Sequence, residues 1–191
     1  MKVKEVLLEA CSLLGLAEEE KTLQNAELEE SAKLGNTEIK KLYNLLQLTL
    51  RDLCTNYFSV TTVSTITSNE KIINLSALNN FVRLLEVSFS GKPILFKTIN
   101  RKINLPFDGT FEVKYATYPT ITSLENDLQD YNILNLDIVV FGLCAYYCLS
   151  VGRFDEFNKF NNQYQDRAES IKELKSFHLP NRRWEWLKRN L

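Results

Sequence analysis

The stretch LDIVVFGLCAYYCLSV, residues 136–151, decides the fold class that we expect for this chain. Apolar side chains surround it on nearly every side of a helical projection, and such a helix belongs in the middle of a bundle. Gly142 and Ala145 are its smallest residues, so they would let a neighbouring helix approach closely. The stretch is shorter than the roughly 20 apolar residues that cross a bilayer, so we expect no membrane-spanning helix.

Three further helices are predicted around this central one. Residues 2–15 repeat apolar side chains at helical spacing and end on a glycine that can act as a C-cap. Residues 36–55 present a broader apolar face, which Asn36 or Thr37 can cap. After a break at Gly152, aromatic residues continue the helical pattern to about residue 176. These segments supply the rest of the expected bundle.

An acidic connector, residues 17–35, separates the first two of these helices. It carries six glutamates and few large apolar residues. Such a composition can form only a weakly anchored helix or a mobile connector, so we expect part of it to be disordered.

The middle third of the chain, residues 58–119, changes to a pattern typical of β-strands. Aliphatic and β-branched residues sit there among threonine and serine. Residues 84–96 are expected to form a hairpin that turns at Ser90-Gly91-Lys92. A second turn at Asp108-Gly109 precedes 110–115, where apolar and polar residues alternate.

Composition places the chain among ordinary globular proteins, since 45% of its 191 residues are hydrophobic and 25% are charged. One domain, or one domain with an insertion, is expected. The 23 cations nearly balance the 24 carboxylates, so nothing favours bulk polyanion binding. The helical parts are acidic, residues 58–119 are mildly basic, and the final residues, 177–191, carry four cations and one carboxylate.

The sequence argues against catalysis, and we expect no enzyme, no cofactor and no metal. The chain has one histidine, His178, and no glycine-rich phosphate loop. The four cysteines, at positions 11, 54, 144 and 148, form no CxxC pair, so we expect free thiols in a reducing compartment. Cys144 and Cys148 could place two metal ligands, but core thiols are the favoured interpretation. The carboxylates around the next helix start, Glu125, Asp127, Asp130 and Asp137, suit helix N-termini.

Two groups of residues are candidates for binding. Lys97, Arg101 and Lys102 lie close together in the β region, where they could contact phosphates or form a solvated strand edge. The C-terminal segment combines cations with two tryptophans, which often anchor protein interfaces. Its candidate interface residues are Arg182, Arg183, Trp184, Trp186, Leu187 and Lys188. This segment could also fold back on its own bundle.

The fold expected from these patterns is α+β: a mostly α-helical bundle with a small antiparallel β insertion and an extended or short-helical C-terminal tail. Residues 1–57 would supply the first helices of the bundle, including the connector 17–35. Residues 58–119 would form the insertion and 120–176 the last helices. Residues 177–191 would form a basic docking tail.

The order of these elements resembles the head-to-tail connector proteins, also called portal adaptors, of tailed bacteriophages. The likeness is carried by the stretches LLQLTLRDLCTNY (45–57), VSFSGKPILF (87–96) and GTFEVKYATYP (109–119), together with 139–151 and 154–164. These stretches span most of the chain. The acidic connector at 17–35 is longer and less patterned than in compact members of the family.

The resemblance implies a structural virion protein without catalytic activity. Such adaptors are expected to form a ring of twelve copies under the portal, to extend the DNA channel and to dock the next neck or tail-completion protein. The tail would then contact the portal, with Trp184 and Trp186 as anchors. Genomic DNA would pass through the lumen without sequence-specific binding. The protein would reside in the virion, and in the host cytoplasm before assembly, with no membrane partner.

Two other interpretations stay open. A non-viral scaffold module could use the same tail to bind one protein partner, as a monomer or a dimer. A small hydrolase associated with the tail machinery would need an acidic pair, such as Glu125 and Asp127, to be catalytic.

Overall fold

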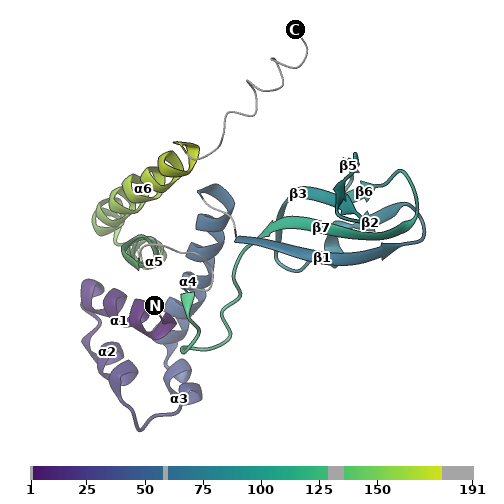
Figure 1. Cartoon of the computed structure of the whole chain (residues 1–191). Helices are drawn as coiled ribbons and strands as arrows, with labels where there is room; N and C mark the ends of the chain where they lie inside the picture. The colour runs from purple at the N-terminus through teal and green to yellow at the C-terminus, as the bar shows by residue number, and fades with distance from the viewer. Residues whose placement is uncertain (1, 58–59, 129–135, 178–191) are drawn as a thin grey trace.

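The computed structural model of the chain describes residues 2–57, 60–128 and 136–177. Helices form a body from which a two-sheet arm projects to one side (Figure 1). The α-helices of the described residues are α1 (Val3–Leu14), α2 (Ala17–Gln24), α3 (Glu30–Gly35), α4 (Thr37–Asn56), α5 (Leu136–Ser150) and α6 (Phe154–Phe177). None of them is long and apolar enough to cross a membrane.

The ends of the first helices follow local sequence signals. Gly15 adopts a left-handed conformation with φ of 72° and ends α1, as expected. The side chain of Asn36 caps α4, because its Oδ1 accepts the backbone N–H groups of Glu38 and Ile39 at 2.9 Å and 3.2 Å. Both predicted helices are therefore confirmed to within about a residue or two.

Helix α5 lies in the middle of the body, in contact with α1, α4 and α6. Its glycine, Gly142, is the point where three helices meet. A Cβ atom built there would lie 2.7 Å from Cγ2 of Thr49 on α4 and 2.9 Å from Cε2 of Tyr164 on α6. The prediction that this small residue permits close helix approach is confirmed.

The arm consists of seven antiparallel strands in the described part of the chain. They are β1 (Val60–Ser68), β2 (Ile72–Asn74), β3 (Phe81–Phe89), β4 (Lys92–Pro93), β5 (Lys97–Ile99), β6 (Lys102–Asn104) and β7 (Gly109–Thr117), with a 3₁₀ turn at Leu75–Ala77. One sheet has the order β1-β7-β3-β4 and the other β2-β6-β5. The expected hairpin turns at Ser90 and Gly91. Their φ angles, 51° and 75°, are both positive, as the two central residues of a type I′ turn require.

The expected fold, a mostly helical bundle with a small β insertion, is wrong. Helix accounts for 51% and strand for 25% of the structure, and the strands build two sheets. These sheets enclose a hydrophobic core of their own around Val87, Phe111 and Val113, all fully buried. The extent of the sheets could not be predicted from the sequence, because several strands have only two or three residues and lie among polar residues.

The acidic connector at 17–35 also differs from expectation, since the structure describes all of it as the short helices α2 and α3 with a link between them. Leu23 is fully buried in the helical core and anchors α2. Glu30 anchors α3, as described below. The predicted docking tail lies outside the described residues.

Candidate assembly interface

The six candidate interface residues of the tail, from Arg182 to Lys188, lie outside the residues that the structure describes, as do His178 and Asp130. The role predicted for the tail therefore stays a prediction. The described residues offer three features that bear on function: a cationic hairpin, an uncovered strand edge and a junction between body and arm.

Lys97, Arg101 and Lys102 come together on the β5–β6 hairpin. Lys97 pairs with Asn104, and Ile99 pairs with Lys102. Because paired residues point to one face of a sheet, Lys97, Ile99 and Lys102 share a face, opposite to the buried Ile103. All three cations are exposed, and none of them forms an ion pair with a described carboxylate. The hairpin is thus a compact, unneutralised positive surface.

The turn of this hairpin holds Arg101 in an unusual backbone conformation. Asn100 and Arg101 have φ angles of 50° and 61°, in the left-handed region that non-glycine residues seldom adopt. The carbonyl oxygen of Arg101 accepts the N–H of Leu75 at 2.9 Å, which ties the turn to the arm. The backbone at the hairpin tip is therefore held in place.

Exposed apolar residues lie beside these cations. Leu95 is 93% exposed and Ile99 is 55% exposed, which makes Leu95 the most exposed large apolar residue of the described chain. On the other side of the arm, Val63 of β1 is 58% exposed. Isolated exposed apolar residues are common, but Val63 and Ile99 lie on the edge strands β1 and β5, and Leu95 lies in the link that leads into β5.

No protein-family model matches the chain, and no curated protein sequence matches it. Its function must therefore be argued from its own residues.

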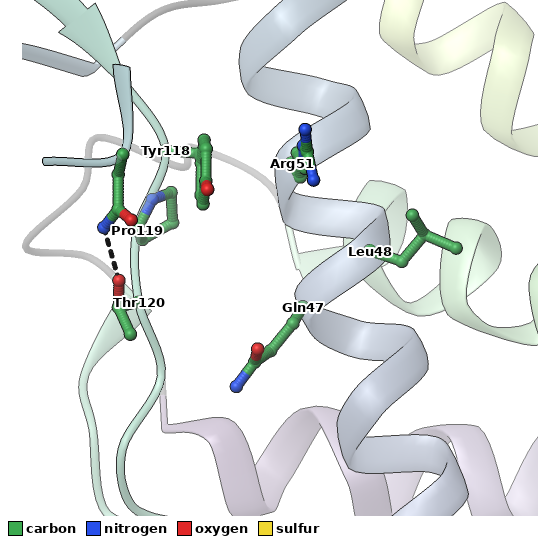
Figure 2. Close-up of a pocket in the computed structure, with 7 residues that line it drawn as sticks. Gln47, Leu48, Arg51, Tyr118, Pro119 and Thr120 are labelled. Carbon is green, nitrogen blue, oxygen red and sulfur yellow. Dashed lines mark hydrogen bonds between the residues drawn. The ribbon is translucent and has the colours of Figure 1, made fainter. Parts of the chain in front are cut away.

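The junction between body and arm contains two open hollows, with volumes of about 340 Å³ and 400 Å³. Both are lined by Asn80 and the segment 118–120, and the smaller one also by Gln47, Leu48 and Arg51 of α4 (Figure 2). The Arg51 guanidinium carbon lies 5.3 Å from the centre of the Tyr118 ring. Gln47 Nε2 donates to the carbonyl oxygen of Ile121 at 3.1 Å. These contacts hold the returning chain against α4.

The lining of the hollows is polar but carries few groups that titrate near neutral pH. Their polar lining comes from amide, hydroxyl and phenol groups and one guanidinium, with no carboxylate, thiol or imidazole among the lining residues. Sequence reasoning missed this junction, because its two sides come from segments some 70 residues apart in the chain. Only the Tyr118-Pro119 pair, which ends β7, carried a local signal.

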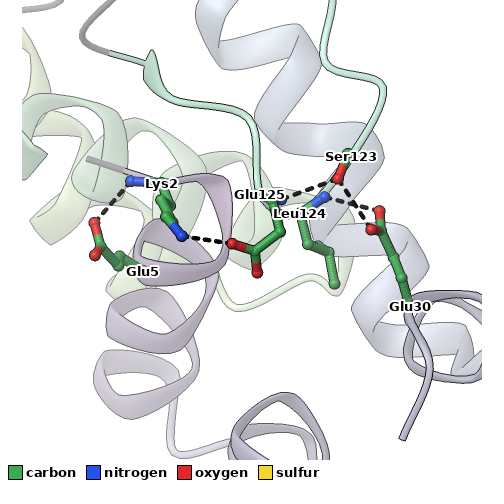
Figure 3. A network of polar contacts seen from close by, with 6 residues as sticks. All are labelled: Lys2, Glu5, Glu30, Ser123, Leu124 and Glu125. Atoms are coloured by element: carbon green, nitrogen blue, oxygen red, sulfur yellow. Dashed lines mark hydrogen bonds and ion pairs between the residues drawn. The ribbon is translucent and has the colours of Figure 1, made fainter. Parts of the chain in front are cut away.

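The acidic pair considered for catalysis has a structural role. Lys2 Nζ donates to Glu125 at 2.6 Å, and this bond lowers the pKa of the Glu125 carboxyl (Figure 3). The backbone of Asp127 forms an isolated β-bridge with Lys2. Both residues therefore hold the returning chain against the start of α1.

A second carboxylate of the same region, Glu30, joins α3 to this returning chain. Its two oxygens accept the N–H of Leu124 at 2.8 Å and the hydroxyl of Ser123 at 2.9 Å (Figure 3). Farther along, Asp137 lies in the first turn of α5, as expected, and 3.9 Å from Arg167.

The four cysteines form no disulfide, and all are buried in the helical body. Burial raises the pKa of Cys11 to about 12 and raises that of Cys144 further. A thiolate is the form that attacks or binds a metal, so burial disfavours both reactions. No cluster of metal-ligating side chains occurs among the described residues. The favoured interpretation of Cys144 and Cys148 as core thiols is confirmed.

A group of tyrosines surrounds Asp52 at the end of α4. The hydroxyl of Tyr164 on α6 donates to Asp52 Oδ2, and Asn56 Nδ2 donates to its Oδ1 at 2.6 Å. Burial raises the pKa of Tyr146 to about 12, and the nearby Asp52 charge adds to this. The group joins α4, α5 and α6.

Proposed function

We propose that this chain is a structural assembly protein, the head-to-tail adaptor of a tailed bacteriophage. It forms a ring beneath the portal, surrounds the DNA path and docks the next neck or tail-completion protein. The observation that carries the proposal is the projecting arm, which has exposed apolar residues and unneutralised cations on its edges (Figure 1). A monomer that acts alone has no need of such a surface.

The resemblance to portal adaptors supports this proposal, because its stretches are spread over both parts of the molecule. Residues 45–57 fall largely on α4, 87–96 on β3 and β4, and 109–119 on β7 and its exit. The remaining two stretches fall on α5 and α6. The likeness thus covers the helical body and the arm together.

The tail has the docking role in this proposal. Trp184 and Trp186 enter pockets on the portal, while Arg182 and Arg183 pair with portal carboxylates. The balanced overall charge suits a channel wall that must let DNA slide, since a strongly cationic wall would hold phosphates. In this proposal the adaptor resides in the virion after assembly and in the host cytoplasm before it.

A tagged full-length chain, expressed during infection of the host cell, tests the proposal. We expect ring-shaped particles by negative-stain microscopy and a large portal subunit by mass spectrometry of the eluate. A lone chain, or a small complex without a ring, would favour a scaffold module and overturn the adaptor function.

A tail variant sharpens this test. Replacing both Trp184 and Trp186 by Ala should reduce portal binding at least about 30-fold, since each hot-spot residue contributes about 2 kcal/mol or more. Asn190→Ala is the matched control in the same segment and should bind as the wild type does. Circular dichroism must show unchanged helix in both variants; a loss of helix would instead place the tail in the core.

A further inference from the structure

The two edges of the larger sheet differ in how they are protected. At one edge, β4 has only two residues, Lys92 and Pro93, and β3 beneath it is interrupted by two bulges. Short edge strands, lysine, proline and bulges are the usual means of preventing edge-to-edge pairing. This edge therefore carries several features that oppose pairing with a further strand.

Strand β1, at the opposite edge, has none of these features. It runs for nine residues, VTTVSTITS, without a charge, a proline or a glycine. Its nine residues pair with β7 in unbroken register, from Val60 with Thr117 to Ser68 with Gly109. Within the described chain, β7 is the one strand that pairs with it, so its outer backbone groups point away from the sheet. Such an edge is a template for another strand.

We propose that β1 accepts the β5–β6 hairpin of a second copy of this chain. The two surfaces lie at opposite margins of the arm, β1 at the lower and β5 at the upper margin (Figure 1). A contact between different surfaces of identical copies is heterologous, and it generates a ring when its rotation closes. This inference names the contact between subunits of the ring. That the contact closes a ring rests on the proposed adaptor function.

Charge complementarity favours the hairpin as the occupant of β1. Residues 92–104 carry four cations and no carboxylate. Near β1 lie three exposed carboxylates: Glu112, which is paired with Thr65 across the strands, and Glu70 and Asp108, which lie beyond the far end of the strand. Two amines, Lys71 and Lys114, are also near, and Lys114 lies between Val63 on β1 and Glu86 on β3, its two cross-strand partners. The hairpin thus approaches an uncharged strand with a net negative border.

The exposed apolar residues also favour pairing of the hairpin with β1. Ile99 lies on β5 of the hairpin, Leu95 lies in the link just before β5, and Val63 lies on the outward face of β1. Pairing the two edges would cover these side chains and satisfy backbone groups in one contact. A contact of β1 with β1 of another copy would cover Val63 alone and leave the hairpin bare.

Cross-linking with a short bismaleimide tests this contact on the full-length chain, because the four native cysteines are buried. The variant with Val63→Cys and Leu95→Cys should give a ladder of dimer, trimer and higher multimers. Each single variant should give no ladder, because it presents only one of the two surfaces. The absence of a ladder in the double variant overturns the proposal. Dimers that already form in the single Val63→Cys variant identify β1–β1 pairing and overturn it as well.

Charge variants distinguish an effect on the edge of β1 from an effect on folding. A further variant carries Thr65→Cys and Leu95→Cys as the cross-linking pair together with Val63→Lys. The ladder should be abolished, because the added amine would face the cations of the hairpin. Thr110→Lys, on the same outward face of the central strand β7, is the matched control and should keep it. Circular dichroism verifies that each variant is folded. Equal ladders in both variants overturn the proposal.

Arg101→Gly tests the occupant, since glycine accepts the positive φ of that position while removing the cation. The ladder should weaken several-fold at low salt. An unchanged ladder together with weakened binding to duplex DNA would assign the hairpin to phosphates instead. If rings form in infected cells but the double-cysteine variant gives no cross-linked ladder, this contact alone is overturned. If the ladder forms but no portal subunit elutes with the tagged chain, the adaptor function alone is overturned.

Discussion

The helical body and the β arm bury apolar residues in very different amounts. In the described chain, 27 buried residues form the core of the body, whereas nine form the core of the arm. Large cores tolerate the loss of one side chain better than small ones do, because many contacts remain. From this comparison we expect the arm to be the more sensitive region, because each of its few buried residues contributes a larger share of its core.

Replacing Phe111 should have the largest effect on the stability of the arm relative to that of the body. Phe111 is fully buried, and its ring centre lies 5.6 Å from those of both Phe89 and Phe107. Phe111→Ala should destabilise the arm by about 3–5 kcal/mol, as is usual for buried phenylalanine. Hydrogen exchange should then show faster exchange in the strands and unchanged protection in α5. Phe154→Ala, at a residue 62% exposed, is the control and should be nearly neutral.

If Phe111→Ala instead speeds exchange in the helices as much as in the strands, the two cores form one cooperative unit, and the contrast between them fails.

Gly142 tests the body in the same way. Gly142→Val should cost about 1–3 kcal/mol, since the added side chain would overlap Thr49 and Tyr164. Gly35→Val is the matched control, because nothing lies within 4 Å of a Cβ there. Urea unfolding followed by circular dichroism measures both. A Gly142→Val variant as stable as the wild type would mean that the three helices can move apart freely.

Alkaline pH should weaken the body through its tyrosines. Burial raises the pKa of Tyr146 and Tyr147 from an ordinary 10.0 to about 12, and for Tyr147 the hydrogen bond to Glu38 adds to this. The folded state therefore binds these protons more tightly than the unfolded chain does, and stability falls as pH rises from about 10 to about 12. Urea midpoints across this range measure the slope. Tyr147→Phe should flatten it, and an unchanged slope would contradict this origin.

Arg51 gives the smallest effect, at the junction of the two regions. Its guanidinium lies over the Tyr118 ring, and Arg51 is exposed, so Arg51→Ala should cost about 0.5–1 kcal/mol. A double-mutant cycle with Tyr118→Leu isolates this contact, and Lys40→Ala serves as the exposed control on the same helix. A coupling energy near zero would show that the junction does not depend on this pair.

Much of the fold could be predicted from local signals. Gly15, Asn36 and the Ser90-Gly91 turn each act within a few residues, so their effects can be read in the sequence. The connector could not be predicted, because Glu30 stabilises it by bonding to Ser123 and Leu124, more than 90 residues away. Long-range pairing of this kind leaves no periodic trace.

The candidate site likewise has one part that local sequence predicts and one part that depends on long-range pairing. The grouping of Lys97, Arg101 and Lys102 follows from their closeness in the chain, and the hairpin brings them together. The edge position of β1 depends on its pairing with β7, some 50 residues later, rather than with the next strand. A run such as VTTVSTITS indicates a strand, but not whether a neighbour covers it.

The pairing of Val60 with Thr117 makes the arm a replaceable module. These residues are the first of β1 and the last of β7, and they lie directly opposite one another in an antiparallel pair. Paired Cα atoms in such a ladder are about 4.5–5.5 Å apart, so a short turn can join them when everything between is removed. The helical body can therefore exchange its arm for another of different length or sequence while its own helices stay in place.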